Sequence, residues 1–365
     1  MRIKQSELFI LALKVREQFL YENSKHLNSA ILAWNMQEEN IAKEHGQMLL
    51  REAWQWINFS IPVISTTFAS FGKMFRFLEK DSISNLFIDE AGQALPQASV
   101  GAILKSRKIM VVGDPSQIKP VLNLDSTMLA LIARHHKVDE NFVSLDASTQ
   151  SLIDRTSQYG YQTNESEWIG IPLWVHRRCK DPMFSISNEI SYNNLMVQGN
   201  DENNIGKAKW IDCSGNANDK FVREQSKWLE LEIKRRLEES PELIDKIYII
   251  TPFSNVAYNL AKDLDKIGFT KRDNETHKPT NVGTVHTFQG KEAKIVYFVL
   301  GADESSEGAA RWVFSNPNLM NVAATRAKEE FYIIGDKKLY ENLKNDIINT
   351  TIDNIDKVNK NSFQS

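Results

Sequence analysis

Two adjacent carboxylates, Asp89 and Glu90, follow a short apolar run in the sequence. Residues 86–88 have the pattern of a buried strand, so both acids should emerge in a loop at its carboxyl end. There an aspartate can hold Mg²⁺ through its water shell, and the next glutamate can orient or deprotonate a water molecule. This is the chemistry of a nucleoside-triphosphate hydrolase. An isolated Asp-Glu pair is more often a solvated turn, so the assignment depends on neighbouring motifs.

A second loop with polar and charged side chains follows the next expected strand, residues 108–112. It reads Gly-Asp-Pro-Ser-Gln-Ile-Lys-Pro over residues 113–120. Gln117 could sense a γ-phosphate, while Pro115 and Pro120 stiffen the loop. Consecutive parallel strands end at one edge of a sheet, so we expect the two loops to converge. A Gly-Asp-Pro string alone more often marks a plain turn.

Together these loops resemble motifs II and III of the superfamily 1 helicases. Further segments resemble the later motifs in the family's order: residues 176–184 motif IV, 283–292 motif V and 321–328 motif VI. The similarity extends over about residues 61–335, and it is to the branch that contains the nonsense-mediated-decay helicase and its bacterial relatives. It implies an α/β fold with two RecA-like P-loop NTPase domains, each a parallel sheet flanked by helices. It also implies ATP as substrate and Mg²⁺ as cofactor.

The resemblance assigns catalytic roles to five residues and makes one of them, Asp89, the Mg²⁺ ligand. The five are Asp89, Glu90, Gln117, Arg178 and Arg326. The usual Gln-Tyr-Arg of motif IV is His-Arg-Arg here, so Arg177 competes with Arg178 for the role of catalytic arginine. Planar guanidinium groups stabilise the charge that spreads over the γ-phosphoryl oxygens during transfer. Nucleotide would then lie between the two domains, and its binding would close the cleft.

The remaining implied roles concern nucleotide binding and nucleic-acid binding. Asp114, Gly290 and Glu292 are expected at the nucleotide, where Gly290 allows close backbone approach and Glu292 accepts hydrogen bonds from the ribose hydroxyls. Hydroxyl and amide groups that bind phosphates position a strand without reading its bases. The resemblance therefore implies sequence-independent binding of single-stranded DNA or RNA. The residues expected there are Thr66, Thr67, Ser187, Asn188, Thr284 and His286.

One expected motif does not occur in the sequence. No Gly-x-x-x-x-Gly-Lys-[Ser/Thr] string is found in the 365 residues, and the amides and lysine of that loop normally hold the phosphates. We therefore expect a first RecA-like domain that is truncated at its N-terminus. Two hypotheses follow. The chain is either a fragment or split subunit of a working helicase, completed by a polypeptide that supplies this Walker A loop, or a remnant that binds nucleic acid or protein without turnover.

The spacing of apolar residues predicts the helices and strands that position these residues. Residues 1–59 repeat apolar positions at helical spacing, as in a helical insertion. Apolar runs at 61–65, 86–88 and 109–112 predict strands of the first RecA-like domain, residues 60–165. Strands at 209–213, 247–251, 281–285, 295–300 and 331–334, with helices between them, predict the second domain over residues 166–348. The polar tail, residues 349–365, is expected to be disordered.

Composition excludes several classes of protein. The net charge of -3, from 44 basic and 47 acidic residues, rules out a histone-like polycation but permits a locally basic cleft. Cys179 and Cys213 are too few for a disulfide framework or a thiolate zinc site. The apolar stretch 8–13 is too short for a membrane span, and no signal peptide is visible. We therefore expect a cytoplasmic protein that does not bind membranes.

Overall fold

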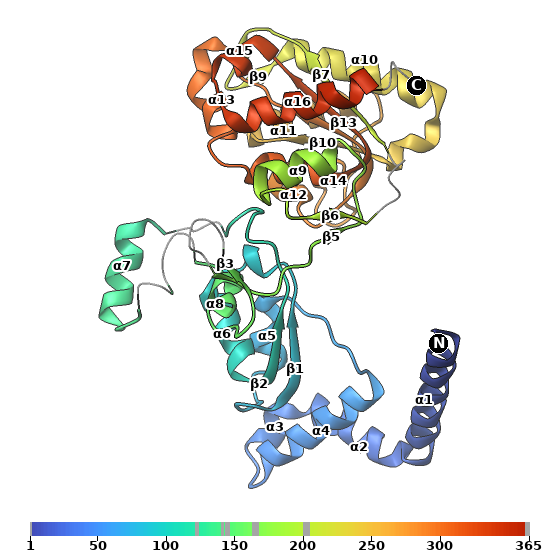
Figure 1. Cartoon of the computed structure of the whole chain (residues 1–365). Helices are drawn as coiled ribbons and strands as arrows, with labels where there is room; N and C mark the ends of the chain where they lie inside the picture. The colour runs from blue at the N-terminus through green and yellow to red at the C-terminus, as the bar shows by residue number, and fades with distance from the viewer. Residues whose placement is uncertain are drawn as a thin grey trace. The chain divides into compact units, whose positions relative to one another are not determined.

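The computed structural model describes residues 2–120, 124–139, 142, 147–162, 168–199 and 205–361. The chain divides into two compact units (Figure 1). Unit 1 comprises residues 1–113 and 120–152, and unit 2 comprises residues 114–119 and 153–365. The motif III loop after residue 113 thus groups with the second unit, although the strand before it belongs to the first.

Unit 1 begins with four helices, where the sequence predicted helices and no strand. They are α1 (Arg2–Glu22), α2 (Ser24–Asn35), α3 (Gln37–Ile41) and α4 (Gly46–Ser60). The remaining elements are α5 (Phe68–Met74), β1 (Ile83–Ile88), the 3-10 helix η1 (Ala91–Gln93), α6 (Pro96–Leu104), β2 (Ser106–Val111), α7 (Ser126–His135) and α8 (Thr149–Asp154), whose last two residues belong to unit 2. A core around Trp54, Phe71 and Phe75 joins α4 to α5.

The only parallel pairing among the described residues of unit 1 is that of β1 with β2. The strand predicted at residues 61–65 is wrong, because these residues form an irregular segment that leads to α5. A β conformation needs a neighbouring strand to bond its backbone amides and carbonyls, and neither β1 nor β2 pairs with this segment.

Unit 2 is built on a five-stranded parallel sheet in the order β11-β10-β12-β13-β7. Its strands are β7 (Lys207–Asp212), β10 (Ile247–Thr251), β11 (Val282–Thr284), β12 (Ala293–Val299) and β13 (Ala327–Gly335). Shorter strands are β3 (Tyr161–Gln162), β4 (Trp168–Ile169), β5 (Val175–His176), β6 (Val197–Gln198), β8 (Ala217–Asn218) and β9 (Phe221–Val222). Each of the five main strands overlaps one that the apolar pattern predicts.

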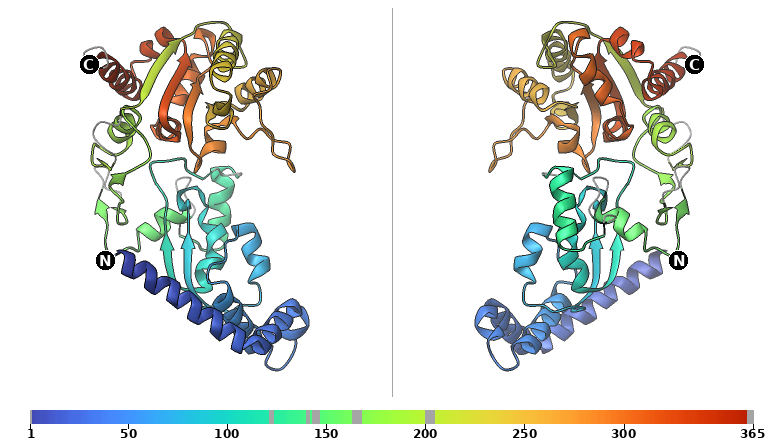
Figure 2. Two further views of the ribbon diagram at one scale, coloured as in Figure 1. Left: turned by 90° about the vertical axis from the view of Figure 1, so that its right-hand side faces the viewer. Right: turned by 90° about the vertical axis from the view of Figure 1, so that its left-hand side faces the viewer.

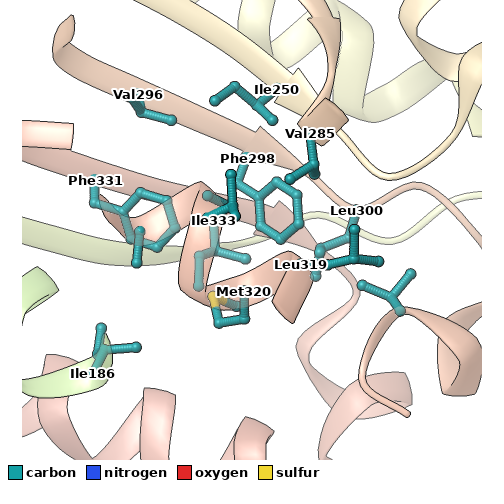
Figure 3. Close-up of a cluster of buried hydrophobic side chains, with 14 of the residues drawn as sticks. Ile186, Ile250, Val285, Val296, Phe298, Leu300, Leu319, Met320, Phe331 and Ile333 are labelled. Atoms are coloured by element: carbon teal, nitrogen blue, oxygen red, sulfur yellow. The ribbon is translucent and has the colours of Figure 1, made fainter. Parts of the chain in front are cut away.

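Helices cover both faces of this sheet (Figure 2). Successive strand side chains point to opposite faces, and accordingly Val296 and Phe298 enter one buried cluster whereas Ile295 and Tyr297 enter another. The first cluster, part of which Figure 3 shows, also takes residues from the three helices α9 (Met183–Ser191), α14 (Asn318–Arg326) and α16 (Asp346–Asn361). The second takes residues from α10 (Arg223–Glu239) and α11 (Ser254–Asp265). A parallel sheet covered on both faces confirms the predicted α/β, RecA-like fold class.

Five short elements complete the described part of unit 2: α12 (Val285–Phe288), α13 (Glu307–Val313), α15 (Lys337–Asn342) and the 3-10 helices η3 (Pro241–Asp245) and η4 (Glu304–Ser306). None of the helices in the described ranges is long and apolar enough to cross a membrane.

The polar tail is not disordered as predicted, since residues 349–361 form most of α16. Ile348, Thr351 and Ile355 recur at helical spacing and are at most 2% exposed. Asn354 donates to the Glu189 carboxylate over 2.6 Å. A narrow apolar stripe thus anchors a helix whose composition is otherwise polar. The rest of the predicted tail, residues 362–365, lies outside the described residues.

Candidate nucleotide and nucleic-acid sites

The acidic pair of unit 1 lies where β1 ends. Asp89 is exposed, and its Oδ1 accepts a hydrogen bond from the Glu90 amide over 3.0 Å. Glu90 adopts a left-handed backbone conformation, φ 52°, and its Oε2 accepts from the Gln93 amide nitrogen over 2.8 Å. Such a conformation is uncommon for a residue with a Cβ, and here it turns the chain sharply from β1 into η1. Both carboxylates therefore emerge beside the strand end.

The motif II loop and the end of β2 touch through their backbones, as the sequence predicts. The Ala91 amide donates to the Val112 carbonyl over 3.0 Å. A Cβ at Gly113 would lie 2.9 Å from the Gly92 nitrogen and 2.8 Å from the Gln150 Oε1. Only glycine fits this approach without displacement of the motif II loop.

The motif III loop, residues 114–119, is held by the side chains of unit 2. Asp114 accepts hydrogen bonds from the Gln117 side chain over 2.9 Å and from the Tyr192 hydroxyl. Asn321, which is fully buried, donates to the Ser116 carbonyl and to the Tyr192 hydroxyl, each over 3.0 Å. Burial, and then the charge of Asp114, raise the pKa of Tyr192 well above its usual value, so its hydroxyl stays protonated and acts as a donor.

A pocket of about 640 Å³ in unit 2 collects residues of four predicted motifs. This volume is typical of a site for a small ligand. The lining comes from the motif III loop, β5 and the turn after it, α9 and the loop that follows it, the residue before β12, and the end of α14. The lining residues are Asp114, Gln117, Val175, His176, Arg177, Arg178, Ser187, Tyr192, Met196, Glu292, Thr325 and Lys328.

Glu292 is the acidic partner of two cations in this pocket. Its Oε2 lies 3.1 Å from the Arg178 Nε, and its other oxygen binds the Lys328 ammonium. The Lys328 hydrogen bond, and the charges of Lys328 and Arg178, hold the pKa of Glu292 below its usual range despite partial burial. Arg177 also lines the pocket but is exposed, and no ion pair of it is found among the described residues. Of the two motif IV arginines, Arg178 is thus the one that pairs with the motif V segment.

Arg326 is buried at the end of α14, only 1% exposed. Its Nη1 donates to the Lys291 carbonyl over 3.0 Å and to the Phe288 carbonyl over 3.5 Å, and its Nη2 donates to the Thr325 hydroxyl over 3.2 Å. The guanidinium therefore ties motif VI to the backbone of motif V. Gly290 lies between these two carbonyls in a left-handed conformation, φ 78°, which favours glycine.

His176 lines the pocket, and Cys179, three residues later, is fully buried. The Cys179 amide donates to His176 Nε2 over 3.0 Å, which requires the neutral ring. Burial, and then the nearby Arg178 and Arg326, lower the pKa of His176 to about 4. Burial raises the pKa of the Cys179 thiol to about 12, so this cysteine is an inert packing group.

The shifted pKa of His176 predicts an acid-sensitive turn. A folded-state pKa below the unfolded value means that the unfolded chain binds the proton more readily, so stability should fall as the pH drops from about 6.5 to about 4. We expect His176→Gln, whose amide oxygen can still accept from Cys179, to flatten this dependence. Urea unfolding of both proteins at a series of pH values measures it. Parallel curves for the two proteins would contradict the assignment.

The residues predicted to bind nucleic acid have different surroundings. Thr284 and His286 lie at the end of β11, where Thr284 is half-buried and His286 exposed. Ser187 and Asn188 are buried, and their polar atoms are used internally: Ser187 donates to Asn321 over 2.7 Å, and Asn188 bonds the Met196 backbone over 3.0 and 3.1 Å. In unit 1, Thr67 accepts from the Ser70 amide as the N-cap of α5, and Thr66 bonds the Thr67 carbonyl.

Sequence reasoning missed Tyr192 and Lys328 as pocket residues, and it missed the buried Asn321, which donates to Tyr192. Asn321 and Lys328 lie inside the motif VI segment, so the motif match could have identified them. Tyr192 follows α9 and has no sequence signal of its own, because its partner Asp114 lies 78 residues earlier.

Comparison with known proteins agrees with the fold and with the motif order. Residues 149–338, more than half of the chain, match an AAA domain family, and residues 9–123 match a second AAA domain family. The chain therefore belongs to the AAA-domain family of superfamily 1 helicases.

Two of three similar curated proteins carry helicase names. It is 23% identical to regulator of nonsense transcripts 1 of Dictyostelium discoideum, over 70% of this chain and 18% of that protein. It is also 23% identical to the ATP-dependent helicase upf1 of Schizosaccharomyces pombe, over 72% of this chain and 28% of that protein. An uncharacterized ATP-dependent helicase of Mycoplasma pneumoniae is 24% identical over 86% of this chain and 30% of its own length. The chain thus spans less than a third of each of these relatives.

Among solved structures, PRRSV helicase is similar over 71% of this chain and 36% of its own, at 12% identity and a TM-score of 0.36. The fold assignment therefore depends on the sheet order and the family matches.

Proposed function

We propose that the chain supplies the greater part of an ATP-dependent helicase or translocase motor. The observation that carries this proposal is the pocket in unit 2, where residues of motifs III, IV, V and VI line one cavity. These segments lie far apart in the sequence, and the fold brings all four to one cavity. Cations beside an acid that can accept from ribose hydroxyls match a nucleotide.

In this proposal unit 1 contributes the water chemistry and unit 2 contributes charge stabilisation. Glu90 accepts the proton of the attacking water, and Gln117 senses the γ-phosphate. Arg178 and Arg326 stabilise charge on the phosphoryl oxygens. Glu292 now neutralises Arg178 and Lys328, so a bound nucleotide would take over these cations as Glu292 turns to the ribose.

The residues of unit 1 fit a magnesium ion. Asp89 offers an exposed carboxylate, a hard oxygen donor, at the strand end. No cluster of three ligating side chains occurs among the residues described, and Mg²⁺ in nucleotide sites needs only one or two carboxylates with waters and phosphates. The ion would neutralise phosphate charge, and Asp89 would hold it.

We further propose a single-stranded DNA or RNA partner, bound independently of sequence, with Thr284 and His286 nearest to it. We also propose that a polypeptide segment carrying the glycine-rich phosphate loop packs on unit 1. Phe87 on β1 and Met110 on β2 are 70% and 57% exposed, whereas parallel strands in folded proteins are normally covered on both faces.

We expect ATP hydrolysis to depend on the presence of the glycine-rich phosphate loop. The 365-residue chain by itself should bind MgATP weakly and hydrolyse it near the background rate, because Asp89 and Glu90 have no cradle for the phosphates. Joined to a segment with the loop, it should hydrolyse ATP, and single strands should stimulate the rate. Phosphate release with and without labelled single strands is the measurement, and the joined protein with Glu90→Gln is the control. Vigorous hydrolysis by the chain alone would contradict the proposal.

A second candidate is a binding module without turnover. The Glu292 contacts favour it, because they already satisfy Arg178 and Lys328 without nucleotide. If the joined protein binds single strands yet has no ATPase activity above the Glu90→Gln control, this second function is the correct one.

A further inference from the structure

The carboxyl ends of the unit 2 strands meet at the edge of the sheet that carries Thr284. β10 and β11 are parallel, and Thr251 is the register partner of Thr284. Phe253 follows Thr251 by two residues, and His286 follows Thr284 by two, so both leave the sheet at this edge. Glu292 and Lys328 instead lie at the amino ends of β12 and β13, so the pocket described above opens at the opposite edge.

A rigid turn lies at the carboxyl edge. It joins β8 to β9, and Asp219 and Lys220 in it both have positive φ, 46° and 68°. Three hydrogen bonds hold it to the loops after β10 and β12: Asn255 donates to the Asp219 carbonyl over 2.9 Å, the Ala302 amide to the Lys220 carbonyl over 2.8 Å, and the Ala217 amide to Asp303 over 2.8 Å. Two strained residues persist only where the surroundings fix them.

Near this turn lies an aromatic pair, in which Trp312 is exposed and Phe253 is half-buried. The ring of Trp312, on α13, lies 5.8 Å from that of Phe253 at an interplanar angle of 33°, and Trp312 is 50% exposed. Lys220 Nζ lies 5.9 Å from the Phe253 ring centre. Ala310 and Val313, on the other face of α13, are fully buried and anchor the helix. The indole is therefore held in place with a large free surface.

We propose that Trp312, supported by Phe253 and Lys220, is a base-stacking platform for single-stranded nucleic acid. The inference rests on the proposed function. A fixed, half-exposed indole loses little conformational entropy when a base stacks on it, and every base offers a π face, so stacking requires no base sequence. The platform shares its edge with Thr284 and His286, which can meet phosphates of the same strand.

Stacking and phosphate contacts respond differently to salt. Phosphate contacts release counterions and weaken steeply as salt rises, whereas stacking on an indole involves no counterion. Lys220 is paired with Asp219 over 2.9 Å, so the platform adds little net charge. Loss of the indole should therefore lower affinity by the same factor at every salt concentration.

Fluorescence anisotropy with two labelled strands of equal length tests the platform. One is oligothymidine and the other is an abasic strand with the same phosphates. Trp312→Ala in the 365-residue chain should weaken oligothymidine binding about tenfold and leave abasic binding unchanged. Trp312→Phe should retain most of the affinity. Leu231→Ala, which removes an exposed apolar side chain from α10, is the matched control and should change nothing.

Three results of this experiment would overturn the platform, and one of them would also overturn the proposed nucleic-acid partner. Equal binding of oligothymidine by Trp312→Ala and by the unchanged chain would overturn the platform while nucleic-acid binding stands, and would leave the aromatic pair as a surface for protein. Equal losses on both strands would also overturn it, since the effect would not involve bases. Binding of neither strand by the unchanged chain would overturn the proposed nucleic-acid partner, and the platform with it.

Discussion

Arg178→Ala and Arg326→Ala should each lower the rate of ATP hydrolysis by about three orders of magnitude in a protein that joins this chain to a phosphate loop. Each guanidinium is expected to act mainly on charge that develops during phosphoryl transfer, so ATP binding should weaken far less. Arg178 reaches the pocket from the turn after β5 and is now held by Glu292. Steady-state hydrolysis and direct nucleotide binding, measured on the same variants, separate the two effects.

Arg177→Ala is the matched control for the motif IV assignment. Arg177 lines the same pocket, but among the described residues it has no ion pair with motif V as Arg178 has, so its loss should cost much less rate than the loss of Arg178. A larger loss at Arg177 would show that the wrong arginine of the pair had been chosen.

Arg326 needs a further control because it also bonds the backbone of motif V. Thermal unfolding of Arg326→Ala and Arg326→Lys shows whether part of the rate loss comes from a loss of stability. If both variants unfold like the unchanged protein and still hydrolyse ATP normally, Arg326 has no catalytic role.

Arg236→Leu should destabilise unit 2 by about 3 kcal/mol, the largest stability effect we expect from a charged residue. Arg236 contacts Glu232 over 2.7 Å, Glu330 over 2.8 Å and the Tyr332 hydroxyl over 2.9 Å. The side chains of Arg236, Glu232 and Glu330 are at most 16% exposed. Its guanidinium also lies 5.0 Å from the centre of the Tyr332 ring. Without it, the nearly buried Glu330 would lose this ion pair, and among the described residues Glu232 would keep only its ion pair with Arg235, whose side chain is 53% exposed.

The neighbouring Arg235 provides the comparison. It also pairs with Glu232, over 2.9 Å, but its side chain is 53% exposed, so Arg235→Leu should cost no more than about 1 kcal/mol. Urea unfolding of both variants measures the difference. Similar losses for the two variants would contradict a role for burial.

The sequence by itself determined the elements whose pattern is local. Strands β10 and β12 and the second half of β13 are nearly continuous runs of apolar residues, because a strand covered on both faces is mostly apolar. The two loops around Asp89 and Gly113 were placed together correctly, since parallel strands end at a common edge. The motif order identified the family, because motif residues are recognised by type and spacing alone.

Only the tertiary structure decided which of the predicted site residues share a pocket. Arg178, Glu292 and Lys328 meet across more than a hundred residues of sequence, and nothing local states that Glu292 would bind both cations. Ser187 and Asn188 have the polar types expected of a phosphate site, yet burial directs their hydrogen bonds inward. Polar residue types indicate the capacity to bond, whereas the partner depends on what the fold brings within reach.

The polar tail and the pair formed by Trp312 and Phe253 both show that composition alone does not predict burial. Residues 349–361 have the composition of a disordered segment, but Ile348, Thr351 and Ile355 suffice to anchor α16 once a complementary surface exists. Trp312 and Phe253 are apolar and would be expected in the core, yet Trp312 is half-exposed. Composition sets the average tendency of a residue to be buried, but burial itself is decided by surfaces from distant parts of the chain, which exist only after folding.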